Sequence, residues 1–216
     1  WIGTYAGLYR YNGSEFRWMD DFESVRNVNC LYVDEEGRLW IGTNDNGLSI
    51  CINERIANVV DQSMGLPSNS VRSIVQSSDG YYYIGTTGSM QILALNNGLK
   101  RVSTLWEVNY ADKIAADDAG HVAAVTSNGR MFLLEQGRIL SSIQLTGGGE
   151  QFNTVAFDED GYLLAGTTGD HFYIYDISNG RFDEQYVRRL ERIFRKVEKG
   201  DKVKVSFFDL PEIEQL

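Results

Sequence analysis

The sequence predicts an all-β protein in which one small antiparallel sheet is repeated about five times. The first indication is that runs rich in Val, Ile, Tyr and Phe alternate with Gly, Asn and Asp turns about every 8 to 12 residues. The second is a short motif that recurs at spacings of 39, 43, 40 and 41 residues. The third is that the second run of each repeat is apolar throughout, as in a strand covered on both faces.

The recurring motif is an apolar run that ends in Thr, and a turn ending in Gly precedes every copy from the second onward. In these turns ("DEEG", "SSDG", "DDAG", "DEDG") Asp and Ser can bond nearby backbone amides, and Gly accepts positive φ. Periods of about 40 to 45 residues are typical of propeller blades or of paired helices, and the hairpin turns favour blades. The copies end at Thr4, Thr43, Thr86, Thr126 and Thr167.

Each repeat has room for four short strands, which form one sheet. Because such a sheet cannot bury both faces alone, successive sheets must stack, which predicts a β-propeller or an incomplete propeller fragment. We expect the Gly of the motif to let neighbouring sheets approach closely. In "HVAAVT" that Gly is Val125, and two preceding Ala residues offset its bulk. The predicted propeller spans 1–187, with a partial blade at 1–19 and complete blades at 28–60, 71–105, 110–145 and 152–187.

Residues 188–216 allow two interpretations. As a hairpin they would begin a further blade, or close a small ring with residues 1–19. As a helix, 188–199 would carry an amphipathic stripe of apolar residues at i, i+3, i+4 and i+7. The blade period favours the hairpin. The abrupt start at "WIGT" indicates a piece of a longer protein.

Composition excludes several classes of function. The 216 residues are 43% hydrophobic and carry a net charge of -10. No run approaches the roughly 18 apolar residues of a membrane helix, and the first residues lack the features of a signal peptide. Residues 188–204 hold eight basic and three acidic side chains, so the remainder of the chain carries -15. This acidic body argues against nucleic acid as a partner.

The chain offers no catalytic motif and no group of residues suited to a metal or a cofactor. The histidines are His121 and His171. The cysteines, Cys30 and Cys51, lie in apolar runs that favour buried thiols over a disulfide between them. Acidic pairs recur in the same turn of several repeats, which favours a structural role because a catalytic pair is needed only once. We therefore expect no catalysis by this chain.

Two stretches, "LYVDEEGRLWIGTNDNGL" and "GLPSNSVRSIVQSSDGYYYIGT", resemble the two-component regulator propeller repeat. The resemblance is close over residues 28–90, weaker to about residue 177, and departs from the pattern at "HVAAVT". Proteins of this family carry propellers as extracytoplasmic sensor modules, joined to a membrane helix and a histidine kinase, a response-regulator-like output or a diguanylate cyclase. Seven blades are usual in the family, so about five indicate a fragment.

The resemblance implies a ligand-sensing module of a bacterial two-component or cyclic-di-GMP signalling receptor, on the periplasmic or extracellular side of a membrane. Oligosaccharides are the known ligand class for some members. The implied partners are a small molecule or oligosaccharide, the output domains of the same polypeptide and a second copy in a homodimer, with the membrane reached only through segments outside this sequence. A protein-protein interaction scaffold is the alternative, and a glycan-acting propeller enzyme is a third hypothesis.

A propeller usually binds small molecules where loops converge on its central channel. Here those loops follow the second strand of each blade or connect one blade to the next, and they offer amide, hydroxyl and aromatic groups. The same residue types also suit turn geometry alone. The candidate ligand-binding residues are Tyr5, Asn44, Asp45, Asn69, Trp106, Tyr110, Asn128 and Asp170.

Overall fold

Five antiparallel sheets follow one another along the computed structural model, which describes residues 1–19, 24–96, 98–146, 148–169 and 171–189. The first sheet has three strands, and the other four have four strands each, hydrogen-bonded in sequence order. The strands are β1 (Ile2–Thr4), β2 (Gly7–Tyr11) and β3 (Phe16–Trp18); β4 (Val28–Val33), β5 (Leu39–Thr43), β6 (Leu48–Ile52) and β7 (Arg55–Val60); β8 (Val71–Gln76), β9 (Tyr81–Thr86), β10 (Met90–Ala94) and β11 (Lys100–Leu105); β12 (Ala111–Ala116), β13 (His121–Thr126), β14 (Arg130–Glu135) and β15 (Arg138–Gln144); β16 (Phe152–Phe157), β17 (Leu163–Thr167), β18 (His171–Asp176) and β19 (Asp183–Arg189).

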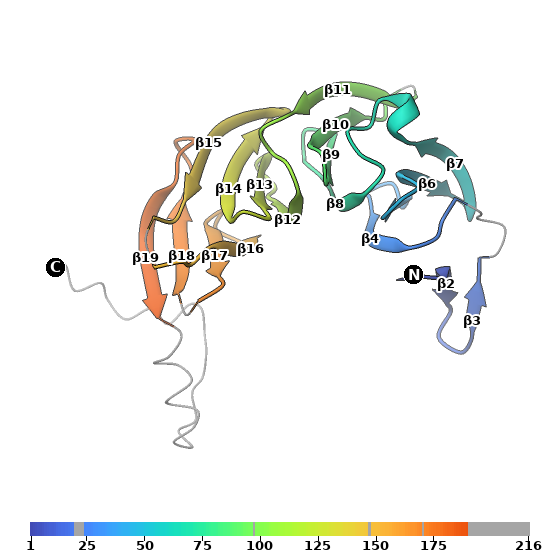
Figure 1. Cartoon of the computed structure of the whole chain (residues 1–216), viewed down its shortest axis with the longest axis horizontal. Helices are drawn as coiled ribbons and strands as arrows, with labels where there is room; N and C mark the ends of the chain where they lie inside the picture. Colours follow the sequence, from blue (N-terminus) through green and yellow to red (C-terminus); the bar gives the residue numbers. More distant parts are fainter. Residues whose placement is uncertain (20–23, 97, 147, 170, 190–216) are drawn as a thin grey trace, which may run out of the picture.

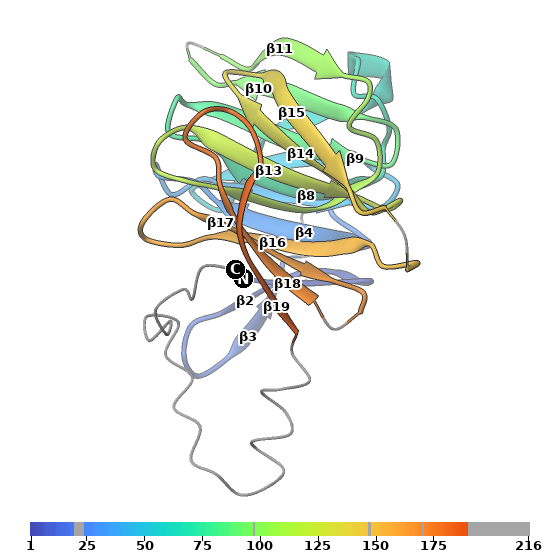
Figure 2. The same cartoon turned by 90° about the vertical axis from the view of Figure 1, so that its left-hand side faces the viewer.

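The sheets stand side by side around an open arc (Figure 1). In the four-stranded sheets the first strands, β4, β8, β12 and β16, lie on the concave edge, and the fourth strands lie on the convex edge. Figure 2, seen from the side of β19, shows the sheets one behind another. This is the blade arrangement of a β-propeller, so the predicted fold class is confirmed. We number the sheets as blades 1 to 5.

Each of the four repeats expected to be complete contains four strands. Within the described ranges the helical element is a single 3-10 turn, η1 (Gln62–Met64), capped by the Asp61 side chain. Of the segment 188–216, Arg188 and Arg189 end β19. Residues 190–216 lie outside the described residues, and with them the hairpin and helix interpretations of this segment.

The hydrophobic cores lie between blades, because neighbouring sheets bury the faces that they turn toward each other. Every residue of β5 is buried, and β9 and β13 are buried from their second residue onward. Between blades 2 and 3, the ring of Trp40 stacks on that of Tyr82 at 4.0 Å. Equivalent clusters of buried apolar side chains join blades 1 and 2, blades 3 and 4, and blades 4 and 5.

The glycine of the repeated motif stands where two blades come closest. A Cβ built on Gly42 would lie 2.6 Å from Cγ1 of Val71 in the next blade, and closer still to Sγ of Cys30. Gly85 faces backbone of the next blade in the same way, with the carbonyl oxygen of Ala111 2.6 Å from a Cβ. These distances are too short for a side chain, so the expectation that Gly permits close approach of the sheets is confirmed.

The acidic turns between first and second strands have a structural role. Oδ1 of Asp117 accepts from the amide of His121 at 2.7 Å, and Oδ1 of Asp158 accepts from that of Tyr162 at 2.8 Å. Oδ1 of Asp34 likewise accepts from the amide of Arg38, and its Oδ2 accepts from the hydroxyl of Tyr82 in the next blade. The recurrence of one bonding pattern explains why the carboxylates repeat.

The two cysteines are free thiols. Burial raises the pKa of Cys30 to about 12, against smaller opposing effects of a hydrogen bond to Gly42 and the charge of Arg72. Burial also raises the pKa of Cys51. Both thiols are therefore protonated at neutral pH and unreactive. No helical segment in the described ranges has the length and apolar character needed to cross a bilayer.

Candidate functional site

Each first strand of blades 2 to 5 contains one extra residue at the same place. Pairing with the second strand skips the second residue of the first strand, so that strand carries a β-bulge. A bulged residue is left out of the ladder, and its side chain is free to turn toward the concave side. The four skipped residues are Asn29, Arg72, Asp112 and Asn153.

A cavity of about 400 Å³ lies where these strands converge, within the range of 300 to 1,000 Å³ typical of small-molecule sites. All four bulged residues line it. Side chains from the end of β13 and from the connections around it complete the wall. The lining residues are Asn29, Arg72, Asp112, Lys113, Val125, Thr126, Ser127, Gln151, Phe152, Asn153 and Thr168.

An ion pair between two bulged residues crosses from blade 3 to blade 4. Nε of Arg72 donates to Oδ1 of Asp112 at 2.8 Å, and each side chain keeps about a third of its surface exposed, 30% and 32%. The Cζ atom of Arg72 also lies 5.4 Å from the ring centroid of Tyr110. The hydrogen bond that Arg72 donates to Asp112 raises the pKa of Arg72, so the guanidinium stays charged. An ion pair with about a third of its surface exposed adds little to stability, and its polar groups remain accessible to a ligand.

Asn29 is held on the concave side by contacts with the next blade. Its Nδ2 donates to the carbonyl oxygen of Val71 at 3.0 Å. The same nitrogen lies 3.4 Å from Oδ1 of Asn44, which also accepts from Oγ of Ser70 at 3.0 Å. Asn44 thus positions a lining residue without lining the cavity itself.

The structure brings two of the sequence-predicted residues close to the cavity. Asn44 contacts Asn29, and the ring of Tyr110 faces Arg72. One backbone hydrogen bond recurs from blade to blade: the amide of the residue after the second strand donates to the carbonyl oxygen of the residue before the first strand. Asn44 is the donor of this bond in blade 2, and Tyr110 is the acceptor in blade 4, where the amide of Ser127 donates to it at 3.0 Å. These loops frame one end of the concave wall.

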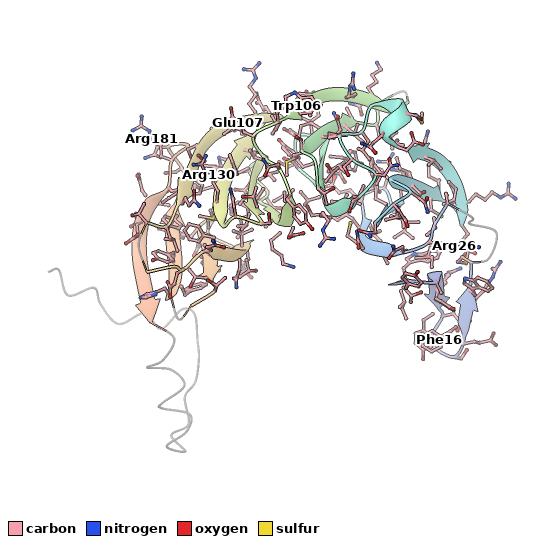
Figure 3. The ribbon with its side chains drawn as sticks, in the orientation of Figure 1. Phe16, Arg26, Trp106, Glu107, Arg130 and Arg181 are labelled. Carbon is pink, nitrogen blue, oxygen red and sulfur yellow. The ribbon has the colours of Figure 1, made fainter. Side chains whose placement is uncertain are left out.

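Four other predicted residues have roles in turns or lie away from the cavity. Oδ1 of Asn69 accepts from the amide of Gln62 at 2.8 Å, and Oδ1 of Asn128 accepts from Oγ1 of Thr126 at 2.6 Å. Oδ2 of Asp45 lies 3.5 Å from Nδ2 of Asn27. These bonds hold loop geometry. Trp106 is 72% exposed and lies at the outer edge of the arc beside Glu107 (Figure 3), on the side opposite the inner strands.

Two predicted residues remain. Tyr5 is 83% exposed in the turn between β1 and β2, where its carbonyl oxygen accepts from the amide of Asn27 at 2.9 Å. Asp170 lies outside the described residues. Sequence reasoning missed the four bulged positions, although their spacings of 43, 40 and 41 residues equal those of the Thr motif in the same blades.

The lining suits a polar ligand. Amides of Asn29 and Asn153, the guanidinium of Arg72 and the carboxylate of Asp112 provide donors and acceptors around a small apolar area at Val125. Among the described residues, no three His, Cys, Asp or Glu side chains gather as metal ligands would. The wall can therefore hydrogen-bond a hydroxyl-rich or charged small molecule through its own side chains.

Comparison with protein families identifies two of the repeats. A family model described as "Two component regulator propeller" matches residues 23–45 and 65–88. Blades 2 and 3 thus each contain a segment that matches the two-component regulator propeller repeat. The two matched repeats include the first and second strands of blades 2 and 3, so the bulged residues Asn29 and Arg72 lie inside them. No curated protein matched the sequence significantly.

Solved structures resemble these propeller repeats in fold. The extracellular domain of the hybrid two-component system BT3049 from B. thetaiotaomicron is 19% identical, with a TM-score of 0.68 over 88% of this chain and 27% of the other. That of BT4673 from the same organism is 19% identical, with a TM-score of 0.55 over 73% of this chain and 21% of the other. Virginiamycin B lyase from Staphylococcus aureus is 17% identical, with a TM-score of 0.58 over 73% of this chain and 55% of the other. The chain thus spans only part of each protein.

Proposed function

We propose that this chain is a ligand-sensing propeller module of a bacterial two-component or cyclic-di-GMP signalling receptor, acting on the extracytoplasmic side and without catalysis of its own. The family match and the extracellular domains of similar fold support the signalling role. The observation that carries ligand sensing is the concave cavity, to which four consecutive blades each contribute the same bulged position.

A ligand in this cavity would contact several blades at once. Its binding energy would then depend on the angles between blades, because Asn29, Arg72, Asp112 and Asn153 stand on separate sheets. A ligand can bias a conformational equilibrium only by binding one arrangement better than another. Contacts spread over several sheets would make the affinity differ between arrangements of the blades. Output domains of the same polypeptide would respond to the resulting change in blade arrangement.

A thermal-shift screen against neutral and acidic oligosaccharides tests the proposal. A ligand present at 100 times its dissociation constant should stabilise the fold by about 2.7 kcal/mol. We expect Arg72→Gln and Asn153→Ala to abolish the shift while leaving the melting temperature of the free protein nearly unchanged.

Trp106→Ala is the matched control, because Trp106 is exposed at the outer edge of the arc. Loss of the shift in Trp106→Ala, with the cavity variants unaffected, would move the site to the blade connection. A screen in which no oligosaccharide stabilises the protein would contradict oligosaccharide sensing and favour the interaction-scaffold hypothesis.

A further inference from the structure

The concave cavity differs from the spaces between neighbouring blades. About 110 Å³ remains between blades 2 and 3, beside Leu66 and Arg101, and about 560 Å³ between blades 4 and 5, beside Tyr173. Pairing with the second strand places Tyr173 where blade 3 has Gln91, so one position of the repeat borders both spaces. The concave cavity instead gathers side chains from blades 2 to 5, so groups from distant parts of the sequence can act there on one ligand.

Positive charge predominates among the described side chains that line the concave cavity. Arg72 and Lys113 are cationic, and Asp112 is the one carboxylate among them. The whole chain carries a net charge of -10, and the residues outside the basic segment 188–204 sum to -15. Two cations at one place in so acidic a protein do not simply reflect its composition. They favour a ligand of negative charge.

The guanidinium of Arg72 is held in place by two neighbours and keeps most of its donors. Nε donates to Oδ1 of Asp112 at 2.8 Å, and Cζ lies 5.4 Å from the ring centroid of Tyr110. Within the described ranges neither Nη atom of Arg72 donates a hydrogen bond. Because the N–H groups of a guanidinium form a rigid planar fork, the edge with the two Nη atoms is available to a planar carboxylate.

Lys113 supplies a second cation from the position after Asp112 in β12. It is exposed, lines the cavity and makes no ion pair with a described residue. In the sheet it pairs opposite Val125, a buried apolar residue of the same wall. The carboxylate of Asp112 is paired with Arg72 instead. The ammonium of Lys113 therefore has no counter-charge of its own among the described residues, and its flexible stem lets it move toward a ligand.

Neutral hydrogen-bonding groups complete the wall. The amides of Gln151 and Asn153 and the hydroxyls of Ser127 and Thr168 line the cavity, and all four residues are exposed. Groups of this kind bond the hydroxyls of a sugar ring. A neutral sugar would use them and leave both cations without a counterpart. A sugar that carries a carboxylate uses the neutral and the charged groups together, and hydrogen bonds to a charged group are the stronger ones.

We propose that the concave cavity selects acidic sugars, in which a carboxylate replaces a hydroxymethyl group of the ring. The carboxylate accepts from both Nη atoms of Arg72 and lies near the ammonium of Lys113. Hydroxyls of the same sugar bond Asn153 and Ser127. Asp112 does not contact the ligand and acts as a positioning residue for the guanidinium. This inference rests on the proposed sensing function and adds the chemical class of the ligand that is sensed.

Isothermal titration with matched pairs of sugars tests the charge requirement. Cellobiouronate and cellobiose form one pair, and digalacturonate and its dimethyl ester form the other. We expect at least one acid to bind a single site about tenfold or more tighter than its neutral counterpart. Raising the NaCl concentration from about 50 to about 500 mM should weaken the acid several-fold and leave the neutral sugars unchanged.

Three results would overturn the selectivity for acidic sugars. The first is equal affinity for the acidic and neutral members of both pairs, which would leave the sensing function in place. The second is that neither acid binds. The third is tighter binding of glucose 6-sulfate than of glucuronate, which would assign the two cations to a sulfate group.

Variants locate the charge requirement. Lys113→Met keeps the length of the side chain and removes its charge, so the acid should bind about tenfold more weakly and the neutral sugar as before. Arg72→Lys keeps the charge but loses the planar fork, and should also weaken the acid about tenfold. Lys100→Met is the matched control, because it removes an exposed lysine from β11 on the convex edge, and should change neither affinity.

Asn153→Ala separates this inference from the proposed function. It removes a neutral group of the wall, so it should weaken acidic and neutral sugars alike. If it does so, and Lys113→Met and Arg72→Lys leave the ratio of the two affinities unchanged, the cavity binds sugars without selecting acidic ones. If none of the three variants changes any affinity, the sugars bind elsewhere, and both the selectivity and the sensing site are refuted.

Discussion

Asp34 shows how one side chain can join two blades. Its carboxylate has no exposed surface and accepts hydrogen bonds from Nε of Arg38, Nε1 of Trp40 and the hydroxyl of Tyr82 in the next blade. The distances are 2.6, 2.8 and 3.0 Å. Burial alone would raise the pKa of Asp34, but these bonds outweigh it and hold the pKa below its ordinary value.

We expect Asp34→Asn to lower the free energy of unfolding by about 3 kcal/mol at neutral pH, because Arg38 and two donors lose a buried acceptor. Since the folded pKa is depressed, the carboxylate stabilises the fold above the pKa of the unfolded chain, and this contribution is lost as pH falls through the folded pKa. Urea unfolding followed by tryptophan fluorescence measures both effects.

The wild type should therefore lose more stability than Asp34→Asn between neutral pH and about pH 3. Glu35→Gln, which changes a neighbouring exposed carboxylate, is the control and should follow the wild type. An Asp34→Asn variant that loses as much stability as the wild type on acidification would show that another group governs the acid response.

At the scale of the strand, the bulge decides what the concave wall presents. Asn29 lies between Val28 and Cys30, which pair opposite the consecutive residues Thr43 and Gly42. Without the extra residue, every later side chain of the strand would point to the opposite face of the sheet, because successive side chains of a strand alternate between the two faces.

Deleting Asn29 should therefore destabilise the protein far more than Asn29→Ala. The substitution removes a half-exposed hydrogen bond to the carbonyl of Val71 and should cost about 1 kcal/mol. The deletion forces β4 out of register or shortens it, and we expect a loss of about 3 kcal/mol or more. Thermal unfolding of the two variants in parallel gives the comparison. Equal losses would mean that β4 accommodates a regular ladder.

The strands were predictable from sequence because apolar runs indicate buried strands and Gly-containing turns indicate where the chain reverses. The bulges were not, since one extra polar residue near a strand end leaves the apolar pattern intact. Candidate site residues were therefore sought in loops. That reasoning found Asn44 and Tyr110, which adjoin the cavity, but it missed Asn29 and Arg72, which line it. It also selected Trp106, whose place at the outer edge depends on how the sheets curve.

At the scale of the whole molecule, stability should vary from blade to blade. A stacked repeat is held mainly by its neighbours, so a sheet with few buried residues opens first. All three residues of β3 are exposed, whereas all five of β10 are buried. The face of blade 1 directed away from blade 2 exposes Phe16 and Trp18, 64% and 50% of their surfaces.

Hydrogen-deuterium exchange read by mass spectrometry should therefore show the fastest exchange of strand amides in β2 and β3 and the slowest in β9 and β10. We expect protection factors in β9 and β10 to approach the global unfolding limit and those of β3 to lie several orders of magnitude lower. Uniform protection across all blades would show that the arc unfolds as one unit.

Stacking of blades was predictable from the repeat, but the spaces between blades were not. The interface volumes of about 110 and 560 Å³ depend on how far each connecting segment reaches over the sheet edge and on which side chain occupies one position. The side chain of Gln91 donates to the carbonyl oxygen of Ser103 in its own sheet, whereas that of Tyr173 lines a cavity. No periodic pattern in the sequence distinguishes the two positions.

The bulges have a consequence for how such a protein can diversify. Because the skipped residue of each first strand makes no ladder contact and fills no core, it can mutate almost freely without loss of the scaffold. The four positions line one cavity, so a single substitution at any of them can change which ligand the cavity binds. Recognition can thus drift during evolution while the architecture that displays it is conserved.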